Sequence, residues 1–230
     1  MKKSILFLTL TFISFIAFAQ SVSLGIKGGI NFATLQSSTS SSSSTETTGS
    51  FTSFSAGAFA DLGFGNLSLQ PALLLTGKGG QDNSTLSIGE TTINIKEKVS
   101  LLYLQLPVDV VYHVPIVVGN IYFGAGPYAA MGLSGKIKGS ISTVSSSDPS
   151  QNQNSTVDRN VKFGSNSDSD FSSGDFGLNI LAGVKFKSGF LASINYDWGL
   201  SNILSKANRG DDNRSIKTRV AGLSVGYAFK

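Results

Sequence analysis

The chain has 230 residues, enough for one domain of moderate size, and it contains no cysteine, which excludes a disulfide framework and thiolate metal sites. Its 18 basic and 14 acidic residues give a formal net charge of only +4, too small to indicate binding to nucleic acid.

The first predicted element is a secretory signal peptide over residues 1–19. Two lysines precede an apolar run from Ile5 to Phe18, and Ala17-Phe18-Ala19 is a small-x-small cleavage signal. A retained anchoring helix is the alternative, but the short run and the cleavage signal favour removal near Ala19–Gln20. Residues 20–230 then form the mature domain.

Eight later segments alternate apolar and polar residues with a period of two, which is typical of strands with one apolar face. Within 190–200, for example, Ile194, Tyr196 and Trp198 alternate with Asn195 and Asp197. The eight predicted strands cover residues 22–33, 52–62, 67–78, 99–113, 120–134, 176–186, 190–200 and 215–229.

Short and long connections alternate between these strands. Residues 63–66, 114–119 and 187–189 form short turns, whereas 34–51, 79–98, 135–173 and 201–214 are long and polar. The Ser-rich segment 37–50 and the segment 135–173 have compositions typical of flexible loops, and the sequence does not show whether they are ordered or modified.

These features predict an all-β fold, an eight-stranded antiparallel up-and-down transmembrane β-barrel with short periplasmic turns and long extracellular loops. Backbone polar groups in lipid need partners within the protein, so a sheet in a bilayer must close on itself. The apolar face of each strand then contacts lipid and the polar face lines the interior. An even number of strands places both termini in the periplasm.

Motifs throughout the mature chain resemble the PorT-like, porin-family outer-membrane β-barrel proteins of Bacteroidetes. The motifs are LGIKGGINFA (24–33), LQLPVDVVYH (104–113), GNIYFGAGPYAAMGLSG (119–135), DFGLNILAGVKF (175–186), INYDWGLSNI (194–203) and TRVAGLSVGYAF (218–229). The resemblance implies an eight-stranded barrel in the outer membrane, and most members of the family have no known role. Outer-membrane barrels usually end on an aromatic residue, whereas here Phe229 is penultimate and Lys230 follows.

Two sets of side chains are candidates for a role in the barrel. Polar residues on the inner face are expected to fill the narrow interior with a network of hydrogen bonds and ion pairs, rather than to line a solute path or a ligand site. These residues are Lys27, Gln70, Gln105, Asp109, Asn179, Lys185, Asn195 and Asp197. Aromatic residues near strand ends on the outer face are expected to form girdles at the membrane interfaces, or else the core of a soluble barrel. They are Phe32, Tyr112, Tyr196, Trp198, Tyr227 and Phe229.

Catalytic and metal-binding signals are weak. His113 is the only histidine, and no serine or acid stands at a diagnostic spacing for a Ser-His-acid hydrolase. Asp168, Asp170 and Asp175 could gather a calcium ion, but they lack the order of a dedicated calcium loop, and a solvated acidic loop is favoured. We therefore predict no catalytic residue, no metal and no cofactor.

The sequence thus predicts a small, non-enzymatic outer-membrane barrel with a structural or surface-interaction role. Its expected partners are outer-membrane lipid, the barrel insertion machinery and an extracellular or envelope protein bound through the long loops. Three alternatives remain. They are a narrow porin or accessory component of a secretion system, a lipid-modifying enzyme, and a soluble lipocalin-like barrel with its apolar face inside.

Overall fold

The computed structural model describes residues 21–39, 45–89, 91–145, 152–164, 166, 168–210 and 213–229. The predicted signal peptide lies outside these residues. In the part of the chain so described, no helix is long and apolar enough to cross a membrane.

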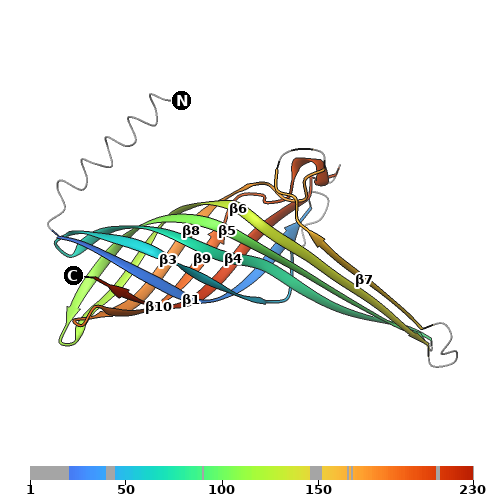
Figure 1. Cartoon of the computed structure of the whole chain (residues 1–230), viewed down its shortest axis with the longest axis horizontal. Coiled ribbons are helices and arrows are strands. Elements are labelled where there is room, and N and C mark those ends of the chain that lie inside the picture. Colours follow the sequence, from blue (N-terminus) through green and yellow to red (C-terminus); the bar gives the residue numbers. More distant parts are fainter. Residues whose placement is uncertain are drawn as a thin grey trace.

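Eight strands form the wall of an antiparallel barrel (Figure 1). Each of these strands pairs with the next one in sequence, and β1 pairs with β10 from Gly25↔Ala228 to Ser38↔Ser215, so that the sheet closes on itself. The predicted all-β, up-and-down antiparallel fold is confirmed. The strands are β1 (Ser21–Ser38), β3 (Phe51–Phe64), β4 (Leu67–Ile88), β5 (Thr91–Ile116), β6 (Gly119–Ser145), β8 (Gly174–Phe186), β9 (Phe190–Gly199) and β10 (Ser215–Ala228).

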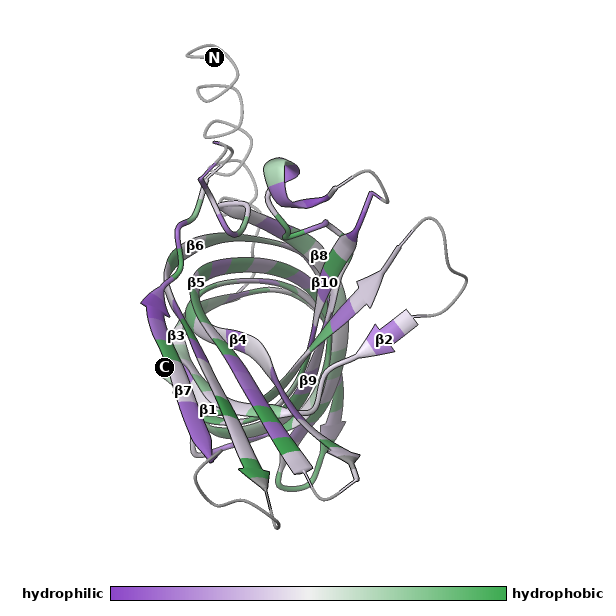
Figure 2. Ribbon diagram, turned by 90° about the vertical axis from the view of Figure 1, so that its right-hand side faces the viewer, coloured by the Kyte–Doolittle hydropathy of each residue, from purple (hydrophilic) through white to green (hydrophobic). Residues whose placement is uncertain are grey.

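Hydrophobic and hydrophilic residues alternate along the strands (Figure 2), and this period of two sorts the side chains between the two faces of the wall. Leu24, Phe176 and Ile194 project outward and are 58–60% exposed, whereas Asn179 and Asp197 point inward and are at most 5% exposed. The apolar face is therefore the outer one. This arrangement excludes the lipocalin-like alternative, which requires the apolar face inside.

Tight turns join the strands at the end of the barrel that holds both termini of the described chain (Figure 1). The turns after β3 and β8 contain Gly65 and Gly189, whose φ angles of 70° and 97° lie in the region that favours glycine. We call this end the turn end and the opposite end the loop end.

At the loop end, β4, β5 and β6 continue well beyond the barrel wall (Figure 1). The distal parts of β4, β5 and β6, together with β7 (Gln153–Asn160), form a four-stranded sheet that we call the arm. The expectation that residues 79–98 and much of 135–173 are irregular loops was therefore wrong. Their Thr, Ile and Val residues favour extended chain, and Ile95 pairs with both Ser84 and Ile141. Two further elements at this end are β2 (Thr45–Thr47) and a 3-10 helix at Lys206–Asn208.

Candidate functional site

The middle of the barrel holds a polar network centred on Asp197 of β9. The two carboxylate oxygens of Asp197 accept hydrogen bonds from Gln105 Nε2, at 2.9 Å, and from Asn179 Nδ2. Lys27 of β1 interacts electrostatically with Asp109 and Asp197. Strict inward alternation on β1, β5, β8 and β9 places these groups together although they are far apart in sequence.

All eight of the polar residues chosen from the sequence point into the barrel. Gln70, Gln105, Asp109, Asn179 and Asp197 are at most 8% exposed, and Lys27, Lys185 and Asn195 are partly buried. The structure brings most of them to the central network, but Lys185 lies nearer the turn end, where its Nζ is 3.1 Å from Asp61 Oδ2.

Sequence reasoning missed a buried ion pair closer to the loop end. Lys78 Nζ lies 2.7 Å from Asp175 Oδ2, and neither side chain has any exposed surface. Asp175 also accepts hydrogen bonds from Thr218 and Ser201, at 3.0 and 2.8 Å. Lys78 Nζ lies 4.3 Å from the ring centroid of Tyr128. Lys78 continues the inward alternation of β4, but its partner stands 97 residues away in sequence.

The three acidic residues considered for a calcium ion lie apart, and Asp175 is buried rather than part of the solvated acidic loop that the sequence favoured. Asp175 points into the barrel, whereas Asp170 forms a two-point ion pair with Arg159 at 2.8 and 2.9 Å. Asp168 accepts a hydrogen bond from Lys162, which holds the pKa of that carboxyl below its usual value. Among the described residues, no group of three or more metal-ligating side chains comes together.

The turn end holds a Ser-His-Asp cluster that the sequence spacing did not reveal. Ser68 Oγ lies 2.9 Å from His113 Nε2, and Asp61 Oδ1 lies 3.8 Å from the same nitrogen. A hydrolytic triad needs the acid on the opposite ring nitrogen, Nδ1, where it orients the imidazole. The cluster is therefore a hydrogen-bonded group inside the barrel and lacks the geometry of a catalytic relay.

Side chains fill the barrel between these polar groups. Two cavities of about 20 Å³ lie along the interior, each with room for about one water molecule. Apolar groups close the interior toward both ends. They are Val111, Tyr122 and Leu181 together with Phe59, Leu74 and Leu191 toward the turn end, and Leu35, Leu101, Tyr103 and Ile203 toward the loop end. Among the described residues, these apolar groups and the polar network together occupy the interior.

Above the apolar group at the loop end, the barrel opens into a cavity of about 340 Å³, which we call the vestibule. Its walls combine apolar side chains, such as Leu35, Phe171 and Ile216, with charged ones. The charged residues are Asp82, Glu97, Arg159, Asp170 and Arg214. Arg159 and Asp170 neutralise each other. Asp82, Glu97 and Arg214 remain, so the vestibule presents both signs of charge around an apolar base.

Residues 18–205 match the protein family described as "Outer membrane protein beta-barrel domain". The chain belongs to this family of outer-membrane β-barrel proteins. The prediction of an outer-membrane barrel is therefore confirmed, and its location is the outer membrane.

Solved structures with a similar arrangement include three proteins of bacterial surfaces. Neisserial surface protein A is 15% identical, with a TM-score of 0.40 over 92% of this chain and 99% of that chain. Ail, the attachment invasion locus protein of Yersinia pestis, solved with the heparin analogue sucrose octasulfate, is 11% identical, with a TM-score of 0.36 over 91% and 100%. The outer-membrane protease OmpT of Escherichia coli is 10% identical, with a TM-score of 0.30 over 92% and 97%. No curated protein matches the chain.

The outer face of this outer-membrane barrel carries aromatic side chains toward both ends of its strands. Tyr227 packs edge-to-face on Phe190 and Phe229 near the turn end, with ring centroids 5.2 and 5.5 Å apart. Nearer the loop end, Trp198 and Tyr196 are 46% and 41% exposed. The six aromatic residues chosen from the sequence all lie on this outer face, and their place at the membrane interfaces stays a prediction.

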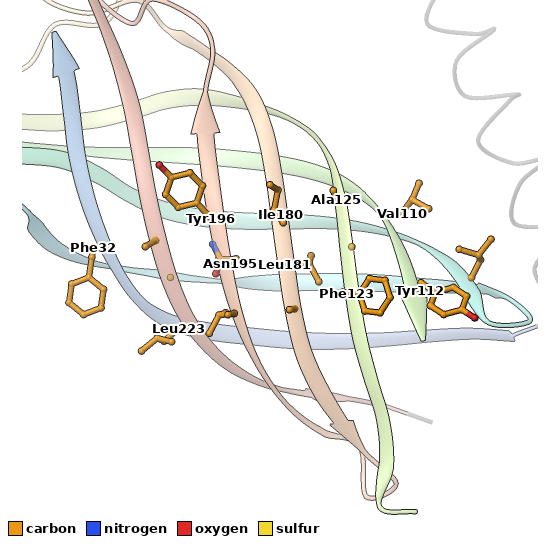
Figure 3. A pocket seen from close by; sticks show the side chains of 16 residues that line it. Phe32, Val110, Tyr112, Phe123, Ala125, Ile180, Leu181, Asn195, Tyr196 and Leu223 are labelled. Carbon is orange, nitrogen blue, oxygen red and sulfur yellow. The ribbon is translucent and has the colours of Figure 1, made fainter. Parts of the chain in front are cut away.

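Between the aromatic groups, the outer wall forms a broad, shallow hollow (Figure 3). Small residues such as Ala125, Ala182 and Ala221 line it, with Phe32, Phe123 and Tyr196 at its borders. Nearly all of this surface is apolar carbon, which suits contact with lipid acyl chains.

Proposed function

We propose that this outer-membrane barrel is a surface-interaction protein, and that its binding region is the vestibule together with the arm. The observation that carries the proposal is the contrast between the two parts of the molecule. The two cavities that the described residues leave along the barrel interior measure about 20 Å³ each, whereas the loop end carries an open cavity of about 340 Å³ and a projecting sheet.

The proposal includes an orientation. Both ends of the described chain lie at the turn end, which we place in the periplasm after removal of the signal peptide, so that the arm and vestibule face outward. The apolar outer wall supports contact with outer-membrane lipid, and the family supports passage through the barrel insertion machinery. The finer assignment to PorT-like proteins of Bacteroidetes rests on the sequence motifs alone.

The expected partner is an extracellular or envelope protein. The vestibule offers an apolar base with hydrogen-bonding groups around it, a combination that suits a protruding side chain or a short segment of another protein. The exposed edge of β7 provides unpaired backbone groups beside it, since β7 pairs only with β6 among the described strands.

A catalytic role is disfavoured by the geometry at His113. Its serine and its acid approach the same ring nitrogen, and Asp61 and Ser68 are at most 7% exposed inside the barrel. A lipid substrate in the membrane would have to cross the strand wall to reach Ser68 Oγ.

Conductance in planar bilayers tests the proposal against the narrow-porin alternative. We expect the refolded full chain to give no discrete conductance steps, because Tyr103, Tyr128 and the Lys78–Asp175 pair fill the interior below the vestibule. The double variant Tyr103→Gly, Tyr128→Gly removes two large rings from the interior. It is the positive control, because conductance from this variant shows that the assay detects an opened barrel. Regular conductance steps from the unmodified chain would overturn the proposal and support the porin.

A further inference from the structure

We propose that four lysines on the outer face of the arm bind the phosphate groups of outer-leaflet lipid. Lys96, Lys98, Lys136 and Lys138 form this lysine cluster, and all four side chains are exposed. The inference rests on the proposed orientation, in which the arm leaves the membrane on the extracellular side.

Strand register places the cluster on one face. Lys98 pairs directly with Lys138, while Lys96 pairs with Ser140 and Lys136 with Ser100. Directly paired residues project from the same face of a sheet, and residues two apart on a strand do so as well. All four lysines therefore share a face, which also continues the outer, lipid-facing side of the barrel wall through the pair Leu102↔Ser134.

The cluster begins where the apolar outer face ends. Leu104 and Leu102 on β5 are followed along this face by Ser100, Lys98 and Lys96. At about 3.3 Å per residue and a strand tilt of about 45°, Lys98 lies roughly 9 Å above Leu102. The headgroup layer on each side of a bilayer is about 5–8 Å thick, so a lysine side chain of about 6 Å that points back toward the membrane reaches it.

The acidic residues of β4 and β5 in the arm do not share the face of the lysine cluster. Asp82 and Glu97 pair with each other on the opposite face, which continues the barrel interior toward the vestibule. Glu97 thus alternates with Lys96 and Lys98 along β5 without sharing their face.

The sheet does little to neutralise the lysine cluster. Like charges placed directly opposite each other, as in Lys98↔Lys138, destabilise a sheet, and the Phe51 ring, whose centroid lies 4.7 Å from Lys98 Nζ, brings no negative charge. Lys138 has one acidic partner, Asp158, at 3.3 Å, whereas in the described part of the chain Lys96 and Lys136 form no ion pair. A phosphate group supplies the missing counter-charge, and several lysines side by side match a surface lined with phosphates.

The test compares lipid retention by the full chain and by two matched triple variants. Lys96→Gln, Lys98→Gln, Lys136→Gln removes most of the cluster and spares the Lys138–Asp158 pair. The control, Lys162→Gln, Lys187→Gln, Lys206→Gln, removes the same charge from exposed lysines outside the arm. Each protein is refolded into vesicles of phosphatidylcholine with one tenth lipid A, extracted in mild detergent, and analysed for bound lipid by native mass spectrometry.

We expect the unmodified chain and the control to retain lipid A in preference to phosphatidylcholine. In the cluster variant, the ratio of bound lipid A to bound phosphatidylcholine should fall at least tenfold. This expected loss follows from the contribution of each lysine near an anionic surface, which raises the affinity about fivefold. Added salt at about 0.5 M should reduce the preference of the unmodified chain, and free inorganic phosphate at millimolar concentration should not. Equal retention by all three proteins, or displacement by free phosphate alone, would overturn the inference.

A separate measurement tests the orientation. The chain lacks cysteine, so Ser140→Cys on the arm and Ser188→Cys in a short turn each give one reactive thiol. A membrane-impermeant maleimide should label only the arm position in intact cells. Labelling of the turn position alone would refute the proposed orientation and with it the assignment to the outer leaflet. Equal lipid retention by the three proteins, with the arm position labelled, would refute the lysine cluster alone, so the two failures are distinguishable.

Discussion

At the scale of single residues, the interior is organised by ion pairs whose members lie far apart in sequence. Lys78 and Asp175 come from β4 and β8, which have β5 and β6 between them in the wall, and their contact joins the two strands across the interior. Loss of one member of such a pair costs much stability, because the other member then remains as a buried, unpaired charge.

The first prediction concerns this pair. Lys78→Met should lower the free energy of unfolding by about 3–5 kcal/mol, since Asp175 would remain buried without its cation. Lys138→Met, which breaks the exposed Lys138–Asp158 pair, should cost less than about 1 kcal/mol. Urea titration in detergent, followed by the fluorescence of Trp198, the single tryptophan, measures both. Equal effects of the two substitutions would show that the interior pair is solvated.

Residue-scale features were the least predictable from the sequence. Alternation identifies which side chains point inward, and it placed all eight selected polar residues there. It does not say which of them meet, because the contact between Lys78 and Asp175 depends on strand tilt and register. Ser68 and Asp61 were missed for the same reason, since nothing near His113 in sequence indicates that β3 and β4 bring them to it.

At the scale of secondary-structure elements, the eight barrel strands could be predicted because each contacts lipid on one face only. The distal strands of the arm have water on both faces, so their alternation is weaker and their polar composition resembles that of a loop. In this segment, Leu86, Ile95 and Ile141 are 41–53% exposed, which shows how little apolar surface the arm buries.

The second prediction follows from this low burial. Replacing residues 84–95 by Asn-Gly should leave the barrel folded, with a change of less than about 1 kcal/mol in its free energy of unfolding. Asn83 and Lys96, which are paired, would then flank a two-residue hairpin turn. Electrophoretic mobility with and without heating reports the folded barrel. Loss of the heat-dependent shift would mean that the arm is needed for folding of the wall.

At the scale of the whole molecule, closure of the sheet is what allows a polar backbone to remain in lipid. β1 and β10 are the first and last strands of the wall, so their pairing is the only one in the wall between strands that are not consecutive. This pairing removes the free edge that each strand would otherwise have. Closure could be anticipated from the even count of strands with one apolar face. Its register could not, because the alternation is compatible with any shift by two residues.

The register of closure can be tested with a single disulfide. Ile30 and Leu223 pair directly across β1 and β10, so Ile30→Cys, Leu223→Cys should form a disulfide under mild oxidation and keep the barrel compact on heating. The control Ile30→Cys, Ile194→Cys places the thiols on strands that flank β10, roughly 10 Å apart, which is beyond disulfide reach. The chain has no other cysteine to compete. A disulfide in the control but not in the paired variant would mean that the wall closes in a different register. A different register would also change which inward side chains of β1 and β10 lie at the same height in the barrel.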